Sequence, residues 1–178
     1  IRGKFRTIPN HVIAAQSLAI PDATNGEKIL LTTGRLSPEK NQSVLIEAFA
    51  KIAEKFPDWK LVIVGRGGLE DSLKKQISTY NPAISGRVIL AGASDDVPSW
   101  LVKSHLFCLP SYWEGFPNSL SEAMAHGLPC VGFSGCDGVN DLIEDGKTGL
   151  LAKGKKDAAT LSEKLEILMA DAGKRKQM

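Results

Sequence analysis

Two glutamates, Glu114 and Glu122, stand with seven residues between them, in a segment bounded by apolar runs at 105–109 and 130–133. Both runs predict buried strands. Between them we expect a loop that carries Glu114, then a helix that begins at or just after Asn118 and carries Glu122 in its first turn. A helix start offers free N–H groups and a positive dipole end to an anion, and a neighbouring carboxylate accepts hydrogen bonds from sugar or ribose hydroxyls. The segment therefore predicts a pocket for a nucleotide sugar.

A pair of cations follows the first predicted strand, in the sequence Gly34-Arg35-Leu-Ser-Pro-Glu-Lys40. Arg35 presents a planar fork of donors and Lys40 a mobile point charge, and such a pair suits a diphosphate. The same cations could instead form surface ion pairs with Glu39 or Glu47. Spacing alone leaves both interpretations open.

Three further features of the sequence admit two interpretations each. The turn Gly65-Arg-Gly-Gly68 resembles a dinucleotide-binding turn, as in an oxidoreductase, but lacks the full GxGxxG spacing and also suits a plain turn. Glu114 and Glu122 could act as the acid and nucleophile of glycoside hydrolysis, or simply be solvated and complement a helix dipole. Trp113 could stack on a sugar or pack beneath its loop.

The elements that must position these residues alternate between strand and helix. Predicted strands span 28–33, 60–64, 88–91, 105–109 and 130–133; predicted helices span 41–55, 69–80, 97–103, the segment with Glu122, 139–143, and a last helix capped by Asp157. Continuous apolar strands, each followed by a helix, indicate an α/β fold with a doubly wound parallel sheet covered by helices on both faces. In such sheets ligands bind where the loops after the strands converge.

The bulk properties of the chain indicate one ordinary globular domain. It has 178 residues, a net charge of +2 and a pI of about 8.4, so no nucleic-acid partner is expected. No apolar run approaches the ~20 residues of a membrane span. Cys108 and Cys130 fall in predicted core strands, which with Cys136 favours free thiols and a cytoplasmic location. No CxxC or HxxxH spacing predicts a metal site, and we expect no cofactor.

The whole frame from Pro110 to Pro129, Pro-Ser-x-x-Glu-Gly-Phe-Pro…Glu-Ala…Gly-x-Pro, resembles the C-terminal domain of family-4 retaining glycosyltransferases of the GT-B fold (glycosyl transferases group 1). The resemblance runs from about Ile8 to Leu151. It implies a Rossmann-like domain that binds a nucleotide diphosphate sugar, UDP-hexose above all, for retaining transfer to a glycan or glycolipid acceptor. A non-catalytic nucleotide-sugar sensor would have the same sequence features.

The resemblance also implies a role for each charged residue. Glu114 would contact hydroxyls of the transferred sugar, and Glu122 would accept hydrogen bonds from the ribose. Arg35 and Lys40 would stabilise the diphosphate leaving group without a metal. Glu114, Arg35 and Lys40 are therefore the predicted catalytic residues.

Backbone groups complete the predicted donor site. The N–H groups of Phe116, Asn118 and Ser119 would cradle the phosphates, and Arg87 and Val88 would open the strand that lies beside the base. The predicted donor-binding residues are Gly34, Arg35, Lys40, Arg87, Val88, Glu114, Gly115, Phe116, Pro117, Asn118, Ser119 and Glu122.

The resemblance divides the chain into residues 1–10, a residual interdomain linker, and residues 11–178, the donor-binding domain with its closing C-terminal helix truncated. The acceptor would bind the N-terminal domain that this chain lacks, so the isolated domain is expected to be inactive. The full-length enzyme is expected in the cytoplasm, with peripheral association at the inner face of the membrane.

Overall fold

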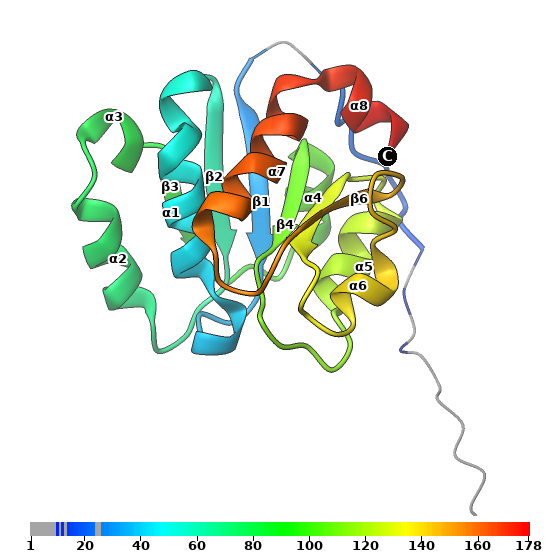
Figure 1. The fold of residues 1–178 in the computed structure, drawn as a ribbon, viewed down its shortest axis with the longest axis horizontal. Helices are drawn as coiled ribbons and strands as arrows, with labels where there is room; N and C mark the ends of the chain where they lie inside the picture. Colours follow the sequence, from blue (N-terminus) through cyan, green and yellow to red (C-terminus); the bar gives the residue numbers. More distant parts are fainter. Residues whose placement is uncertain (1–9, 11, 13, 24–25) are drawn as a thin grey trace, which may run out of the picture.

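A computed structural model describes residues 10, 12, 14–23 and 26–178, which form a parallel six-stranded sheet of order β3-β2-β1-β4-β5-β6 (Figure 1). The strands are β1 (Lys28–Thr33), β2 (Trp59–Val64), β3 (Val88–Gly92), β4 (Leu106–Leu109), β5 (Cys130–Phe133) and β6 (Gly149–Ala152). The helices are η1 (Pro38–Lys40), α1 (Gln42–Ile52), η2 (Ala53–Lys55), α2 (Glu70–Ser78), α3 (Pro82–Ser85), α4 (Val97–Lys103), α5 (Asn118–Ala125), α6 (Val139–Leu142), α7 (Ala158–Ala170) and α8 (Ala172–Gln177). The predicted α/β class with a doubly wound parallel sheet is confirmed.

The strands are apolar along their whole length because both faces of the sheet are covered. Every residue of β4 and β5 is buried, and β1 and β2 each have one half-buried position in six. Helices α1 and α7 pack side by side in front of the strands (Figure 1). Right-handed crossovers on either side of β1 place α4 and α5 on the opposite face.

The structure adds four elements that the sequence analysis did not contain: the edge strand β6, the short 3-10 helix η1 and the short helices α3 and α8. Only a turn was predicted near Gly149, and the strand that follows has four residues, too few for a periodic signal. It forms because Gly149 lets the backbone approach β5, where a Cβ atom would meet the Cys130 oxygen at 2.2 Å. The basic tail forms α8, in which Arg175 is buried.

The predicted linker, residues 1–10, lies outside the described residues except for Asn10. Among the described residues, no helix is both long enough and apolar enough to cross a bilayer.

The point where the sheet changes direction lies between β1 and β4, because the chain winds outward from β1 to β3 and then returns to the other side of β1. Loops after these two strands diverge to opposite faces and leave a crevice at their carboxyl ends. The loop after β1 carries Gly34 to Lys40, and the loop after β4 carries Glu114. The topology therefore brings the predicted cations and the first glutamate to one crevice.

His105, at the opposite end of the sheet, makes the stability of the fold depend on pH. It is 9% exposed, and its Nδ1 accepts a hydrogen bond of 3.2 Å from the Ile29 N–H. Burial, and after it the charges of Arg175 and Lys28, lower the pKa of His105, while Asp58 opposes them weakly. The unfolded chain therefore binds this proton more readily than the folded chain.

We expect the free energy of unfolding to fall as the pH is lowered from 7 through about 6.5, the ordinary histidine pKa, toward the lower folded value. The loss should be smaller in His105→Asn, which keeps an acceptor near the Nδ1 position but cannot be protonated. Urea titrations of both proteins between pH 7 and pH 5 measure it. Parallel pH curves for the two proteins would contradict the assignment.

Candidate functional site

The centre of the candidate site is an ion pair between the loops after β1 and β4. Lys40 Nζ lies 2.6 Å from Glu114 Oε1, and the Ser111 hydroxyl donates to the same oxygen at 2.6 Å. The Glu114 side chain is only 9% exposed. The alternative in which Lys40 pairs with Glu39 or Glu47 is therefore wrong. The structure joins two residues that the sequence analysis assigned to different parts of the donor.

Arg35 lies on the same loop after β1 as Lys40 and is exposed. Its carbonyl oxygen accepts a hydrogen bond of 2.8 Å from the buried Gln42 side chain, which holds the loop against the start of α1. The loop is also paired with the end of β2 and the loop that follows it, because the Gly34 N–H donates to Val64 O and the Leu36 N–H donates to Arg66 O. Within the described part of the chain, the exposed Arg35 guanidinium makes no hydrogen bond or ion pair, so it remains available to an anion.

The turn Gly65–Gly68 serves this backbone pairing. A Cβ atom on Gly65 would meet the Gly34 oxygen at 1.9 Å, and one on Gly67 would meet the Leu36 oxygen at 2.3 Å. The glycines let the loops after β1 and β2 lie against each other. The dinucleotide-binding interpretation gains no support from this geometry.

The start of α5 supplies part of the predicted phosphate cradle. No hydrogen bond within the described part of the chain uses the N–H of Phe116 or Ser119, so both remain available to an anion. The Asn118 N–H, however, donates to Phe116 O at 3.0 Å. The turn before α5 therefore uses this N–H, and its place in the cradle stays a prediction.

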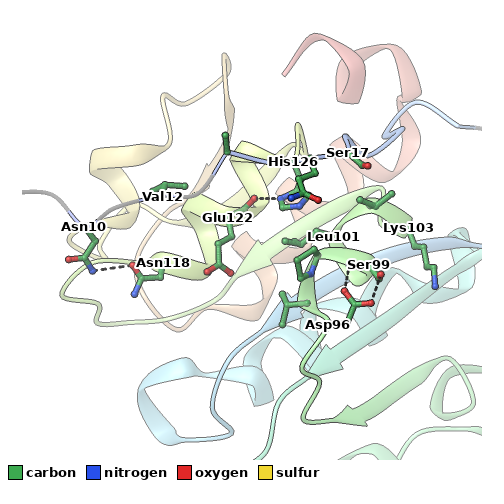
Figure 2. A pocket seen from close by; sticks show the side chains of 16 residues that line it. Asn10, Val12, Ser17, Asp96, Ser99, Leu101, Lys103, Asn118, Glu122 and His126 are labelled. Atoms are coloured by element: carbon green, nitrogen blue, oxygen red, sulfur yellow. Dashed lines mark hydrogen bonds between the residues drawn. The ribbon is translucent and has the colours of Figure 1, made fainter.

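A cavity of about 990 Å³ is lined by α4, α5 and residues 10, 12 and 14–17 (Figure 2). Glu122 and Asn118 line it from α5, and Asp96 and Ser99 from the first turn of α4. Neither Lys40 nor Glu114 lines the cavity. The Glu114 loop leads directly into α5, and Asn118 and Glu122 of α5 line the cavity.

Arg87 and Val88 lie at the wrong end of β3 for a donor site. The Arg87 guanidinium donates to the carbonyl oxygens of Ala53, Phe56 and Trp59, and its Nε to that of Ala83. Val88 is buried. Both precede the carboxyl edge by the length of the strand, so the prediction that they lie beside the base is wrong.

The residues that the sequence analysis missed at the carboxyl end of β3 are those at the start of α4. The Asp96 carboxylate caps this helix, accepting from the Ser99 N–H at 3.1 Å and the Ser99 hydroxyl at 2.5 Å. The signal was present in the sequence as an aspartate two residues before a proline, a common helix start.

The loop after β5 also packs against the site, and the sequence analysis did not predict this contact. Gly138 has φ +81°, and a Cβ atom there would lie 3.2 Å from Pro117 Cδ and 3.5 Å from Gly115 O. Cys136 is buried beside it, and burial together with the Glu114 charge raises the pKa of its thiol to about 11. Trp113 is 62% exposed, so packing beneath its loop is excluded.

No group of three or more histidine, cysteine, aspartate or glutamate side chains with the geometry to hold a metal ion occurs within residues 10, 12, 14–23 and 26–178. The residues that face the crevice are instead cations, N–H donors and single carboxylates. Such a set suits an anion that also carries hydroxyl groups.

This fold and site define a doubly wound domain whose switch point gathers cations and N–H donors of the kind that suit an anionic ligand. Residues 16–178 match the family described as glycosyl transferases group 1, and the chain belongs to that family.

Relatives and solved structures agree with this assignment. The chain is 37% identical over 160 residues to the UDP-Gal:alpha-D-GlcNAc-diphosphoundecaprenol alpha-1,3-galactosyltransferase of Escherichia coli, covering 83% of this chain and 41% of the relative. A variant of S. aureus TarM, solved with UDP, superposes with a TM-score of 0.81 at 27% identity, over 97% of this chain and 33% of TarM. Anabaena HepE, solved with UDP-glucose, gives 0.76 at 27% identity, over 85% and 41%. The chain spans about two fifths of the length of the first curated relatives it matches.

Proposed function

We propose that this chain is the donor-binding part of a retaining glycosyltransferase that transfers a hexose from UDP to a glycan or glycolipid. The observation that carries the proposal is the Lys40–Glu114 pair at the switch point, next to the free N–H groups of the α5 start. UDP in the TarM structure and UDP-glucose in the HepE structure support the choice of donor. The name of the E. coli relative supports a lipid-linked acceptor.

In this proposal the donor spans the start of α5. The diphosphate binds Arg35, Lys40 and the N–H groups of Phe116 and Ser119, which offset the charge that develops as the sugar leaves. The nucleoside occupies the cavity, where Glu122 accepts hydrogen bonds from the ribose. The transferred sugar contacts Glu114, which diphosphate binding would partly release from Lys40.

The reaction we propose is a front-face displacement at the anomeric carbon, which retains the configuration. The acceptor would bind a second domain that closes over this one, excludes water and completes the site. We therefore propose that these 178 residues bind the donor but do not transfer the sugar.

We also propose a cellular location for the full-length enzyme. Three buried free thiols, Cys108, Cys130 and Cys136, support a reducing cytoplasm. A lipid-linked acceptor would require the full-length enzyme to work at the inner face of the membrane.

Calorimetric titration of this chain with UDP and UDP-glucose tests the proposal. Both ligands should bind, with NAD as the negative control, and the affinities should be the same in EDTA as in Mg²⁺, because cations and N–H donors neutralise the diphosphate. A preference for NAD would favour an oxidoreductase domain. A strict requirement for Mg²⁺ or Mn²⁺ would show that the proposed pocket chemistry is wrong.

A further inference from the structure

Asn41 is the residue that joins three loops of the site. Its side-chain Nδ2 donates to Pro110 O at 3.0 Å, in the loop after β4, and to Lys155 O at 3.3 Å, in the turn after β6. Asn41 itself ends the loop after β1 and begins α1. One amide thus connects three segments that are far apart in the sequence.

The two hydrogen bonds between the first two loops bracket the residues that hold Glu114. Asn41 donates to Pro110 O, and the Tyr112 N–H donates to Glu39 O at 3.1 Å. Lys40 lies between the two partners on one side, and Ser111 lies between the two on the other. These are the two side chains that contact Glu114 Oε1.

The backbone of Asn41 adopts a left-handed conformation. Among the described residues it is the one non-glycine with positive φ, at φ 56° and ψ 32°. Asparagine tolerates this left-handed conformation better than most residues, and glycine tolerates it best. Glycine, however, would have no side chain to reach the other loops.

We propose that Asn41 is a positioning residue of the donor site: its amide holds the loop of Lys40 against the loop of Glu114. This inference rests on the proposed function. Because the donor spans both loops, releasing them should weaken donor binding even where the fold is intact. A purely structural role would instead make any loss of affinity follow the loss of stability.

Three variants separate these cases. Asn41→Gly keeps the left-handed backbone and removes the amide, and Asn41→Asp keeps the size but cannot donate to the two carbonyl oxygens. Asn81→Gly is the matched control, because the Asn81 side chain caps α3 by accepting from the Ile84 N–H, away from the site.

We expect the Kd for UDP-glucose to rise about tenfold in Asn41→Gly and Asn41→Asp and to stay unchanged in Asn81→Gly. The Tm of Asn41→Gly should match that of Asn81→Gly. Wild-type affinity in Asn41→Gly, or an affinity loss in all three variants in proportion to Tm, would overturn the proposal.

Amide hydrogen exchange of Tyr112 in the ligand-free chain tests the connection itself. Exchange should be about tenfold faster in Asn41→Gly than in Asn81→Gly, because the loops separate more often. Equal exchange would overturn the inference. If the wild-type chain bound no nucleotide sugar, the proposed function would fail, and this measurement would still decide whether Asn41 holds the loops together.

Discussion

Replacing Gly65 with alanine is expected to destabilise the fold by about 3–5 kcal/mol, because two costs coincide at one residue. Gly65 has φ +150°, which side-chain-bearing residues rarely adopt, and its new Cβ atom would meet the Gly34 oxygen at 1.9 Å. That neighbour is backbone and belongs to the loop of the predicted cations. For a chain of this size, the loss corresponds to a Tm lower by about 10 °C or more.

Gly68→Ala, three residues further along the same turn, is the matched control. A Cβ atom at Gly68 meets nothing within 4 Å, and its φ lies outside the left-handed region. We expect a change within about 1 kcal/mol of wild type, since alanine mainly restricts the unfolded chain there. Thermal unfolding of the two variants compares them directly. Equal Tm values would show that the approach of the two loops is not tight.

The second large effect is expected at the two glutamates, which should respond differently to the same ligands. Glu122 lines the cavity, and Glu122→Ala should weaken binding of free UDP by about 1–3 kcal/mol, because the ribose hydroxyls lose their acceptor. Glu114 lies on the loop before α5 and does not line the cavity. Glu114→Gln, which retains a group for Ser111 and Lys40 to contact, should leave UDP affinity nearly unchanged and weaken UDP-glucose only.

Calorimetry with both ligands on both variants measures this difference, with Glu163→Ala as a control for removing an exposed glutamate on α7, remote from the cavity. Two results would contradict the assigned roles. One is an equal loss for UDP and UDP-glucose in Glu114→Gln. The other is wild-type UDP affinity in Glu122→Ala.

Tertiary contacts decided the partners of the charged residues. The sequence offered Lys40 the nearby acids Glu39 and Glu47, yet it pairs with Glu114, 74 residues away. Arg87 was expected at the base, and its guanidinium instead donates to the carbonyl oxygens of Ala53, Phe56 and Trp59 near the amino end of the sheet. A local motif fixes the type of a side chain but not the end of the strand at which it lies or the groups that the fold brings to it.

The sequence by itself determined the class of the fold and the element that carries each motif. Runs of apolar residues and helical spacing are local signals, and they correctly predicted five strands and the helix that carries Glu122. Three features depend on the tertiary structure alone. They are the sixth strand, the close approach of the Gly34 carbonyl that leaves no room for a side chain at Gly65, and the connection of three loops through Asn41. These features depend on backbone atoms that approach across loops distant in the sequence, and no short-range pattern records such distances.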